Sequence, residues 1–99
     1  PFTDAQLDAS SAYVMPIMLR DLERQGTLRL ALREKHGVQT SLFYPNAHRF
    51  TAYRNRFGDI SLPQTELASA TEVTLPLFPH MTTEQQDRVV NALTEELAT

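Results

Sequence analysis

Apolar and polar residues alternate along this chain with two different periods, and these predict where strands and helices lie. Residues 1–10 are mainly polar and serve as a lead-in or as the end of a preceding helix. From Ser11 to Leu19 both alternating sets of positions are apolar, which predicts a strand covered on both faces. Because Pro16 has no N–H group to donate, this strand should lie at a sheet edge or carry a bulge.

The pattern then changes to the helical period. Thr27 can cap a helix. The apolar positions of this helix follow the i, i+3, i+4 spacing, at Leu28, Ala31 and Leu32. Gly37 ends it, because glycine readily takes the left-handed conformation after a helix. A second strand follows at once over Val38–Tyr44, so these elements form a strand-helix-strand unit.

The second half of the chain repeats the alternation of helix and strand. A turn at residues 57–59 leads to a helix from Pro63 to about Ala70, with Leu67 as its clearest core contact. Residues 72–77 predict a short third strand, placed at an edge because of Pro76.

The last helix has the strongest sequence signals. Thr82 and Gln85 form a capping box at its start. One apolar stripe, which should pack on the sheet, runs along it at Val89, Val90, Leu93 and Leu97. The predicted order is therefore β-α-β-α-β-α, an α+β fold with a small sheet of about three strands covered by helices.

Composition limits the broad class of protein. The chain has 99 residues, 41% hydrophobic and 21% charged, with a net charge of −3. These values predict a single globular domain over residues 1–99. The negative total implies no general attraction to nucleic acid or to an anionic membrane.

The sequence contains no cysteine, which excludes disulfides, thiol nucleophiles and cysteine-ligated metals within these residues. No apolar run approaches the roughly 20 residues that a membrane span needs, and the first residues lack the features of a signal peptide. We therefore expect a cytoplasmic location. Because the chain begins with Pro1, we expect that it was processed, trimmed or cut from something longer.

Most groups that could meet a ligand lie between Thr40 and Arg56, in TSLFYPNAHRFTAYRNR. Arginines and aromatic residues interleave there, and such a combination can hold a nucleotide through its phosphates and base. A second interpretation is a solvated arginine face with aromatic side chains that plug the end of the sheet. Binding of single-stranded nucleic acid is a third, and the acidic total weakens it.

Two motifs resemble a known family. GVQTSLFYPNAHRFTAY, from Gly37 to Tyr53, and LASATEVTLPLFPHMTTEQQDRVVNAL, from Leu67 to Leu93, are similar to the C-terminal small domain of the DegT/DnrJ/StrS family of PLP-dependent sugar aminotransferases. Two departures stand out. Phe43 occupies a position that is often histidine in the family, and Asn46 replaces a proline.

The resemblance implies a fold type I aminotransferase in which a large domain binds pyridoxal phosphate (PLP). Such an enzyme works as a homodimer and moves an amino group from an amino acid to a keto sugar carried by a nucleotide. The implied substrate-binding residues of this chain are Tyr44, His48, Arg49, Tyr53 and His80. His80 can face either the substrate cleft or the solvent, and solvent is favoured.

The covalent chemistry is not expected within these residues. PLP transamination needs a lysine that forms a Schiff base, and the only lysine is Lys35, at the end of a helix where a cation meets the carbonyl groups. We therefore expect Lys35 to be solvated and no catalytic or cofactor-binding residue in this chain. No metal site is expected from the three histidines, and Glu95 and Glu96 should be solvated.

Two functions remain open. The chain is either the small domain of a sugar aminotransferase, inert by itself, that closes the substrate cleft, or a free-standing module that binds a nucleotide sugar or regulates a partner. The first interpretation predicts an exposed apolar surface where the large domain would pack, with Phe2, Leu7 and Tyr13 as candidates.

Overall fold

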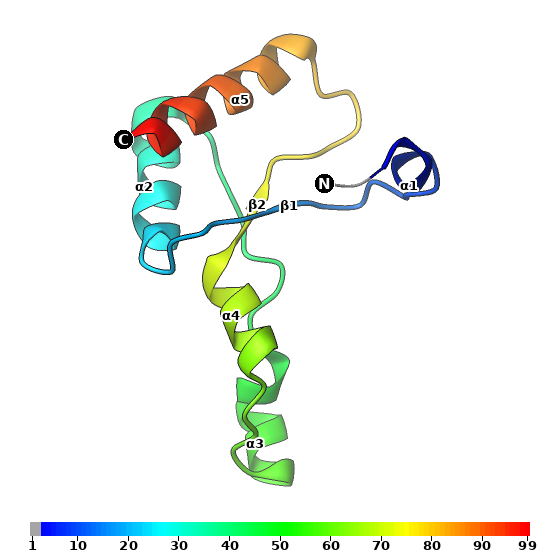
Figure 1. The fold of residues 1–99 in the computed structure, drawn as a ribbon, viewed down its shortest axis with the longest axis vertical. Helices are drawn as coiled ribbons and strands as arrows, with labels where there is room; N and C mark the ends of the chain where they lie inside the picture. Colours follow the sequence, from blue (N-terminus) through cyan, green and yellow to red (C-terminus); the bar gives the residue numbers. More distant parts are fainter. Residues whose placement is uncertain (1–2) are drawn as a thin grey trace.

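The computed structural model describes residues 3–99 and has an α+β fold in which helices accompany a small antiparallel sheet (Figure 1). In chain order the elements are α1 (Asp4–Asp8), β1 (Met15–Met18), α2 (Arg24–His36), η1 (Ala47–Arg49), α3 (Thr51–Phe57), α4 (Pro63–Thr71), β2 (Glu72–Leu75) and α5 (Thr83–Ala98).

The sheet consists of β1 and β2, which pair antiparallel from Met15 opposite Leu75 to Met18 opposite Glu72. Pro16 lies opposite Thr74, whose own N–H and C=O groups bond on the other side of β2, to Ser41. The pair Pro16–Thr74 therefore needs no hydrogen bond, and the missing N–H of Pro16 leaves the ladder intact. The prediction that Pro16 lies in an edge strand is confirmed.

The predicted strand Val38–Tyr44 is wrong as a full strand, because only Ser41 pairs with β2, through N–O distances of 3.0 and 2.9 Å to Thr74. In this register the next pair would join Gln39 to Pro76, which has no N–H to donate.

On the other side of Ser41, the ladder would join Phe43 to Glu72. There the side chain of Glu72, and not its backbone oxygen, accepts the hydrogen bond. The N–H of Phe43 donates to Glu72 Oε2 at 3.2 Å, while the backbone oxygen of Glu72 accepts from Gln25 Nε2 at 2.7 Å. The sheet thus has two strands and one bridge. β2 pairs with β1 on one side and is bridged to Ser41 at Thr74 on the other, so it is an edge strand of the two-stranded sheet that one bridge covers in part.

The core lies where α2 and α5 pack together beside the sheet. Its buried hydrophobic members are Leu28, Leu32, Val38, Leu75, Val89 and Ala92. α2 begins at Arg24, before the predicted cap Thr27, and ends at Gly37, which has the expected left-handed φ of 64°. The hydroxyl of Thr27 donates to the carbonyl of Arg24 instead, at 3.1 Å.

The capping box at Thr82 and Gln85 is confirmed, and α5 follows it. The apolar stripe is narrower than predicted, because Val89 is buried and Leu93 partly buried whereas Val90 and Leu97 are exposed. α4 begins at Pro63 as predicted. Leu67, predicted as a core contact, is 47% exposed.

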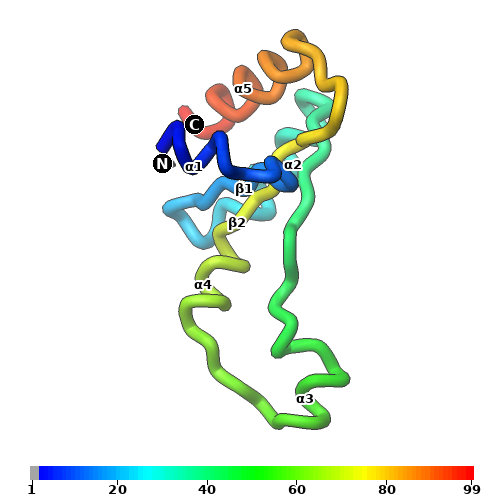
Figure 2. Tube along the Cα trace, turned by 90° about the vertical axis from the view of Figure 1, so that its right-hand side faces the viewer, coloured from blue at the N-terminus to red at the C-terminus, as the bar shows by residue number. Residues whose placement is uncertain are grey.

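Residues 42–62, hereafter the arm, extend from the sheet and return to α4 (Figures 1 and 2). The sequence predicted a loop there, and the arm instead contains η1 and α3, which pack on each other. The radius of gyration is 15.8 Å, against about 13 Å for a compact domain of 100 residues. Residues 3–99 as a whole thus form an elongated body of 47 × 34 × 22 Å.

At the other end of the chain, α1 lies apart from the core (Figure 1) and begins with a capping box of Thr3 and Gln6, where the sequence suggested a lead-in or the end of a preceding helix. Leu7 and Tyr13 are 56% and 72% exposed, while Phe2 lies outside the described residues. No helix within residues 3–99 has the length and apolar character needed to cross a membrane.

Candidate functional site

Tyr44 lies at the base of the arm, 64% exposed, and its hydroxyl is 3.2 Å from the hydroxyl of Tyr13. This hydrogen bond raises the pKa of Tyr44 above its ordinary value. The ring of Tyr44 stacks on that of Phe43 with 4.9 Å between centroids. The pair of hydroxyls, joined across 31 positions of the sequence, forms a polar point on an aromatic surface.

His48 and Arg49 of the arm both contact Glu66 of α4, a residue that the sequence pattern did not single out. His48 Nε2 lies 3.0 Å and Arg49 Nη2 2.8 Å from the same oxygen, Oε1 of Glu66 in α4. The N–H of Leu62 donates to that oxygen too, at 3.2 Å.

These donors act together on Glu66. The hydrogen bond from His48, then the one from the backbone of Leu62, and to a lesser extent Arg49, lower the pKa of Glu66 to about 2. The side chain of His48 is only 7% exposed. Glu66 is therefore a carboxylate near neutral pH and holds η1 against the start of α4. His48 and Arg49 therefore have a structural role, because their contacts with Glu66 fix the position of the arm.

Tyr53 lies on α3 and borders an apolar hollow of about 320 Å³ in the arm, together with His48, Ile60 and Leu62. Its side chain is exposed. His48 and Tyr53 thus line one hollow of the arm, and Arg49 follows His48 in η1.

His80 does not join this group. It lies in the segment between β2 and α5, whereas the arm extends from the opposite end of β2 (Figure 1). His80 is exposed and has a φ of 67°, in the left-handed region. The predicted preference of His80 for solvent agrees with this exposure, and the five predicted substrate-binding residues do not form one site.

The other arginines of the arm also have local partners. Arg54 Nε lies 2.9 Å from Asp59 Oδ1, and the guanidinium of Arg56 lies 5.3 Å from the ring centre of Phe57. Phe50, Tyr53 and Phe57 are all exposed, so the interpretation that they plug the end of the sheet is wrong. Asn46 Oδ1, at the start of η1, is buried without a hydrogen-bond partner among the described residues.

Comparison with known proteins assigns the chain to a family. Residues 1–94 match the DegT/DnrJ/EryC1/StrS aminotransferase family. The chain belongs to this family. It is also similar to the crystal structure of NtdA from Bacillus subtilis with bound cofactor PMP, with 31% identity and a TM-score of 0.77. This match covers 87% of the chain but 20% of NtdA, so the chain spans about one fifth of that relative.

Membership of the aminotransferase family makes Lys35 the residue to test, since it is the only amine side chain. Lys35 Nζ lies 3.1 Å from Oε1 and 3.2 Å from Oε2 of Glu96. His36 Nε2 approaches Oε1 of the same carboxylate at 2.9 Å. Attachment of a cofactor at Lys35 would require this ion pair to break.

Glu96 departs from the prediction of a solvated carboxylate. It is buried, and the hydrogen bonds from His36 and Lys35 lower its pKa. His36, Glu95 and Glu96 offer ligand atoms within 4.8 Å of one another. A cation there would compete with the ammonium of Lys35 for the same oxygens. This cluster therefore joins the C-terminal ends of α2 and α5 and is not assigned a metal.

Proposed function

We propose that residues 1–99 are the C-terminal small domain of a PLP-dependent aminotransferase, which transfers an amino group from an amino acid to a nucleotide-linked keto sugar. The observation that carries this proposal is the unequal coverage of the match to NtdA, 87% of this chain against 20% of that one. In this proposal a large domain outside these residues binds the cofactor, and the small domain closes one side of the substrate cleft.

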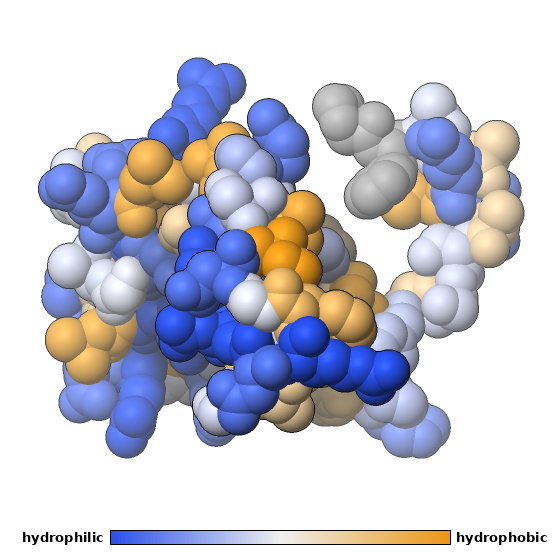
Figure 3. Space-filling model, turned by 90° about the horizontal axis from the view of Figure 1, so that it is seen from below, coloured by the Kyte–Doolittle hydropathy of each residue, from blue (hydrophilic) through white to orange (hydrophobic). Residues whose placement is uncertain are grey.

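The distribution of aromatic side chains supports a missing covering domain. Every aromatic residue among residues 3–99 is exposed: Tyr13, Phe43, Tyr44, Phe50, Tyr53, Phe57 and Phe78. Hydrophobic side chains also appear among hydrophilic ones when the molecule is viewed from the end of the arm (Figure 3). Proteins rarely leave so many large apolar groups in water, so we infer that the large domain or a second subunit covers part of this surface.

The same surface offers the groups for the substrate. Tyr44 and Tyr53 have exposed rings, whereas His48 and Arg49 already bond to Glu66. Phenol groups combine an apolar face with a hydroxyl that can donate to sugar oxygens. We therefore assign the direct substrate contacts to Tyr44 and Tyr53, with His48 and Arg49 fixing the arm on which Tyr53 lies.

The experiment compares the intact protein with the 99-residue chain. Each receives PLP, an amino acid donor and a panel of nucleotide-linked keto sugars, and amino sugar product is measured by mass spectrometry. The intact protein should form product and the 99 residues alone should form none. Turnover by the 99 residues, or an upstream coding sequence without a large cofactor-binding domain, would refute the proposal.

A further inference from the structure

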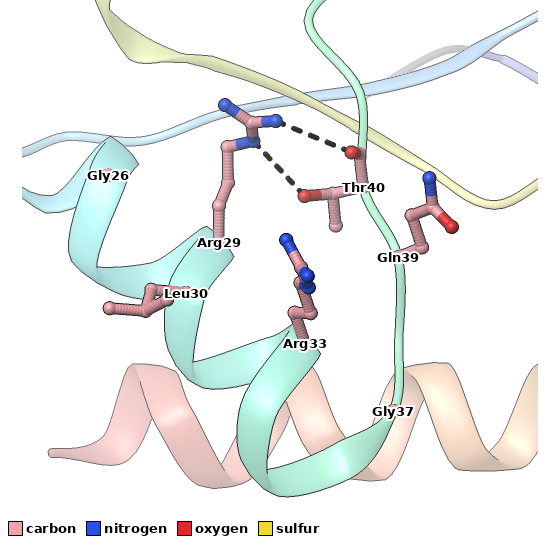
Figure 4. Close-up of a pocket in the computed structure, with 7 residues that line it drawn as sticks. All are labelled: Gly26, Arg29, Leu30, Arg33, Gly37, Gln39 and Thr40. Carbon is pink, nitrogen blue, oxygen red and sulfur yellow. Dashed lines mark hydrogen bonds between the residues drawn. The ribbon is translucent and has the colours of Figure 1, made fainter.

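The side of the sheet beyond the bridge at Ser41 is closed to a further strand by a side chain of α2. Successive residues of an antiparallel strand direct their backbone groups to opposite sides, so Thr40 points away from β2. Arg29 covers it there. Its Nε donates to Thr40 Oγ1 at 3.2 Å, and its Nη2 lies 3.4 Å from the backbone oxygen of Thr40 (Figure 4). A strand cannot pair at Thr40 without displacing this arginine.

The outer side of β1 has no such cover. Pro16 and Met18 direct their backbone groups to that side, because Met15 and Ile17 are the residues that face β2 in hydrogen-bonded pairs. Among residues 3–99, no strand pairs with β1 on this side, and no loop or helix backbone bonds to Pro16 or Met18. This side of β1 is therefore the free edge of the sheet.

The free edge has the character of a strand that pairs readily. Residues 11–19 contain no charged side chain, and Met15 and Met18 are 50% and 54% exposed. Proteins usually protect such an edge with charged side chains, a bulge, a covering segment or a proline. The register with β2 runs without interruption, so no bulge is present in β1. Pro16 is the one protective feature that this strand contains.

Pro16 acts at the position where a further strand would bond. Its nitrogen faces the outer side and carries the ring in place of a hydrogen atom. An incoming strand therefore finds no donor, and the ring occupies the space that its carbonyl oxygen would enter. The pairing with β2 is unaffected, because Pro16 and Thr74 exchange no hydrogen bond. The proline thus opposes pairing on the outer side alone.

We propose that Pro16 prevents the free edge of β1 from pairing with β1 of a second copy of this chain. An antiparallel pair of identical strands is two-fold symmetric, so each contact that one copy makes is repeated by the other. With Ile17 opposite its counterpart, Pro16 of each copy lies opposite Met18 of the second copy. Such a pair would normally exchange two hydrogen bonds, and the proline removes one of them. Half of the bonds of these symmetric pairs are lost.

Sedimentation velocity of the intact protein over a dilution series tests the proposal. Pro16→Val restores the N–H group in a residue that favours strands, and it creates no cavity because Pro16 is exposed. Met15→Val is the matched control, since it places the same residue type at an exposed neighbour whose backbone faces β2. The association constant of Pro16→Val should be about tenfold or more above that of the control and of the unmodified protein, because each copy regains a hydrogen bond.

Hydrogen exchange locates the contact on the strand. The Met18 amide should exchange more slowly in concentrated than in dilute Pro16→Val, and Met15→Val should show no such difference. Pro16→Ala restores the same N–H group with a smaller side chain and should change both readouts in the same direction, so the test does not depend on valine alone.

Equal association of Pro16→Val and Met15→Val would overturn the proposal. A Met18 amide that exchanges equally fast at every concentration of Pro16→Val would overturn it as well. Association and exchange are measured rather than turnover, so the result is independent of the proposed aminotransferase role.

Discussion

Replacement of Leu32 by alanine tests the packing that holds α2 on the rest of the chain. Leu32 is fully buried, at 0% exposure, in the cluster that joins α2 to α5 and β2. Truncation of a buried leucine costs about 2.7–5 kcal/mol, through lost transfer free energy and the cavity that remains. A chain of this length has a total stability of about 5–15 kcal/mol, so Leu32→Ala should remove a large part of it.

Leu30→Ala is the matched control, because Leu30 lies on the same helix and is 60% exposed. It should change the free energy of unfolding by no more than about 0.5 kcal/mol. The assay is urea denaturation of the 99-residue chain, followed by circular dichroism, with the denaturant slope checked for equality between variants. Similar losses in the two variants, or a loss below about 1 kcal/mol for Leu32→Ala, would refute the assigned core.

Three further predictions concern backbone, charge and surface. Gly37→Ala should lower the free energy of unfolding by about 1–2 kcal/mol, because φ at Gly37 is 64°, whereas Gly26→Ala should be neutral or stabilising in the same urea assay. The folded-state pKa of Glu66 is about 2, below its unfolded value of about 4.5. Its contribution to the free energy of unfolding is therefore complete above about pH 4.5 and is lost as the pH falls toward 2. The protection factor of the Leu62 amide, which compares its exchange rate with the intrinsic rate at the same pH, should fall over that window, and an unchanged protection factor would contradict the assignment. Phe57→Ser should leave the urea midpoint of the 99-residue chain unchanged but lower the melting temperature of the intact protein, and equal effects on both would argue against a covered surface.

The sequence predicted best what depends on neighbouring residues. The capping box at Thr82, Pro63 at the start of α4 and the left-handed Gly37 are all local signals, and each lies where it was expected. The strand predicted over Val38–Tyr44 shows the limit of such local signals. Its pairing fails because Pro76 falls opposite Gln39, and that register appears only when two distant segments are brought together.

The polar clusters show the same limit. The carboxylate of Glu66 is hydrogen-bonded to His48, which lies 18 positions away in the sequence. The carboxylate of Glu96 is hydrogen-bonded to Lys35, which lies 61 positions away. Local sequence shows only a charged residue near a helix end, which usually means a solvated side chain. The sequence does show an acidic residue, Glu66, in the first turn of α4 and a histidine-arginine pair before it, at His48 and Arg49.

The most direct test of the central claim is to find the lysine that attaches the cofactor. The intact protein loaded with PLP is reduced with borohydride, digested, and mapped by mass spectrometry. We predict one stoichiometric pyridoxyl label on a lysine outside residues 1–99, and Lys35→Arg should leave that label in place. A stoichiometric label on Lys35, lost together with turnover in Lys35→Arg, would contradict the account.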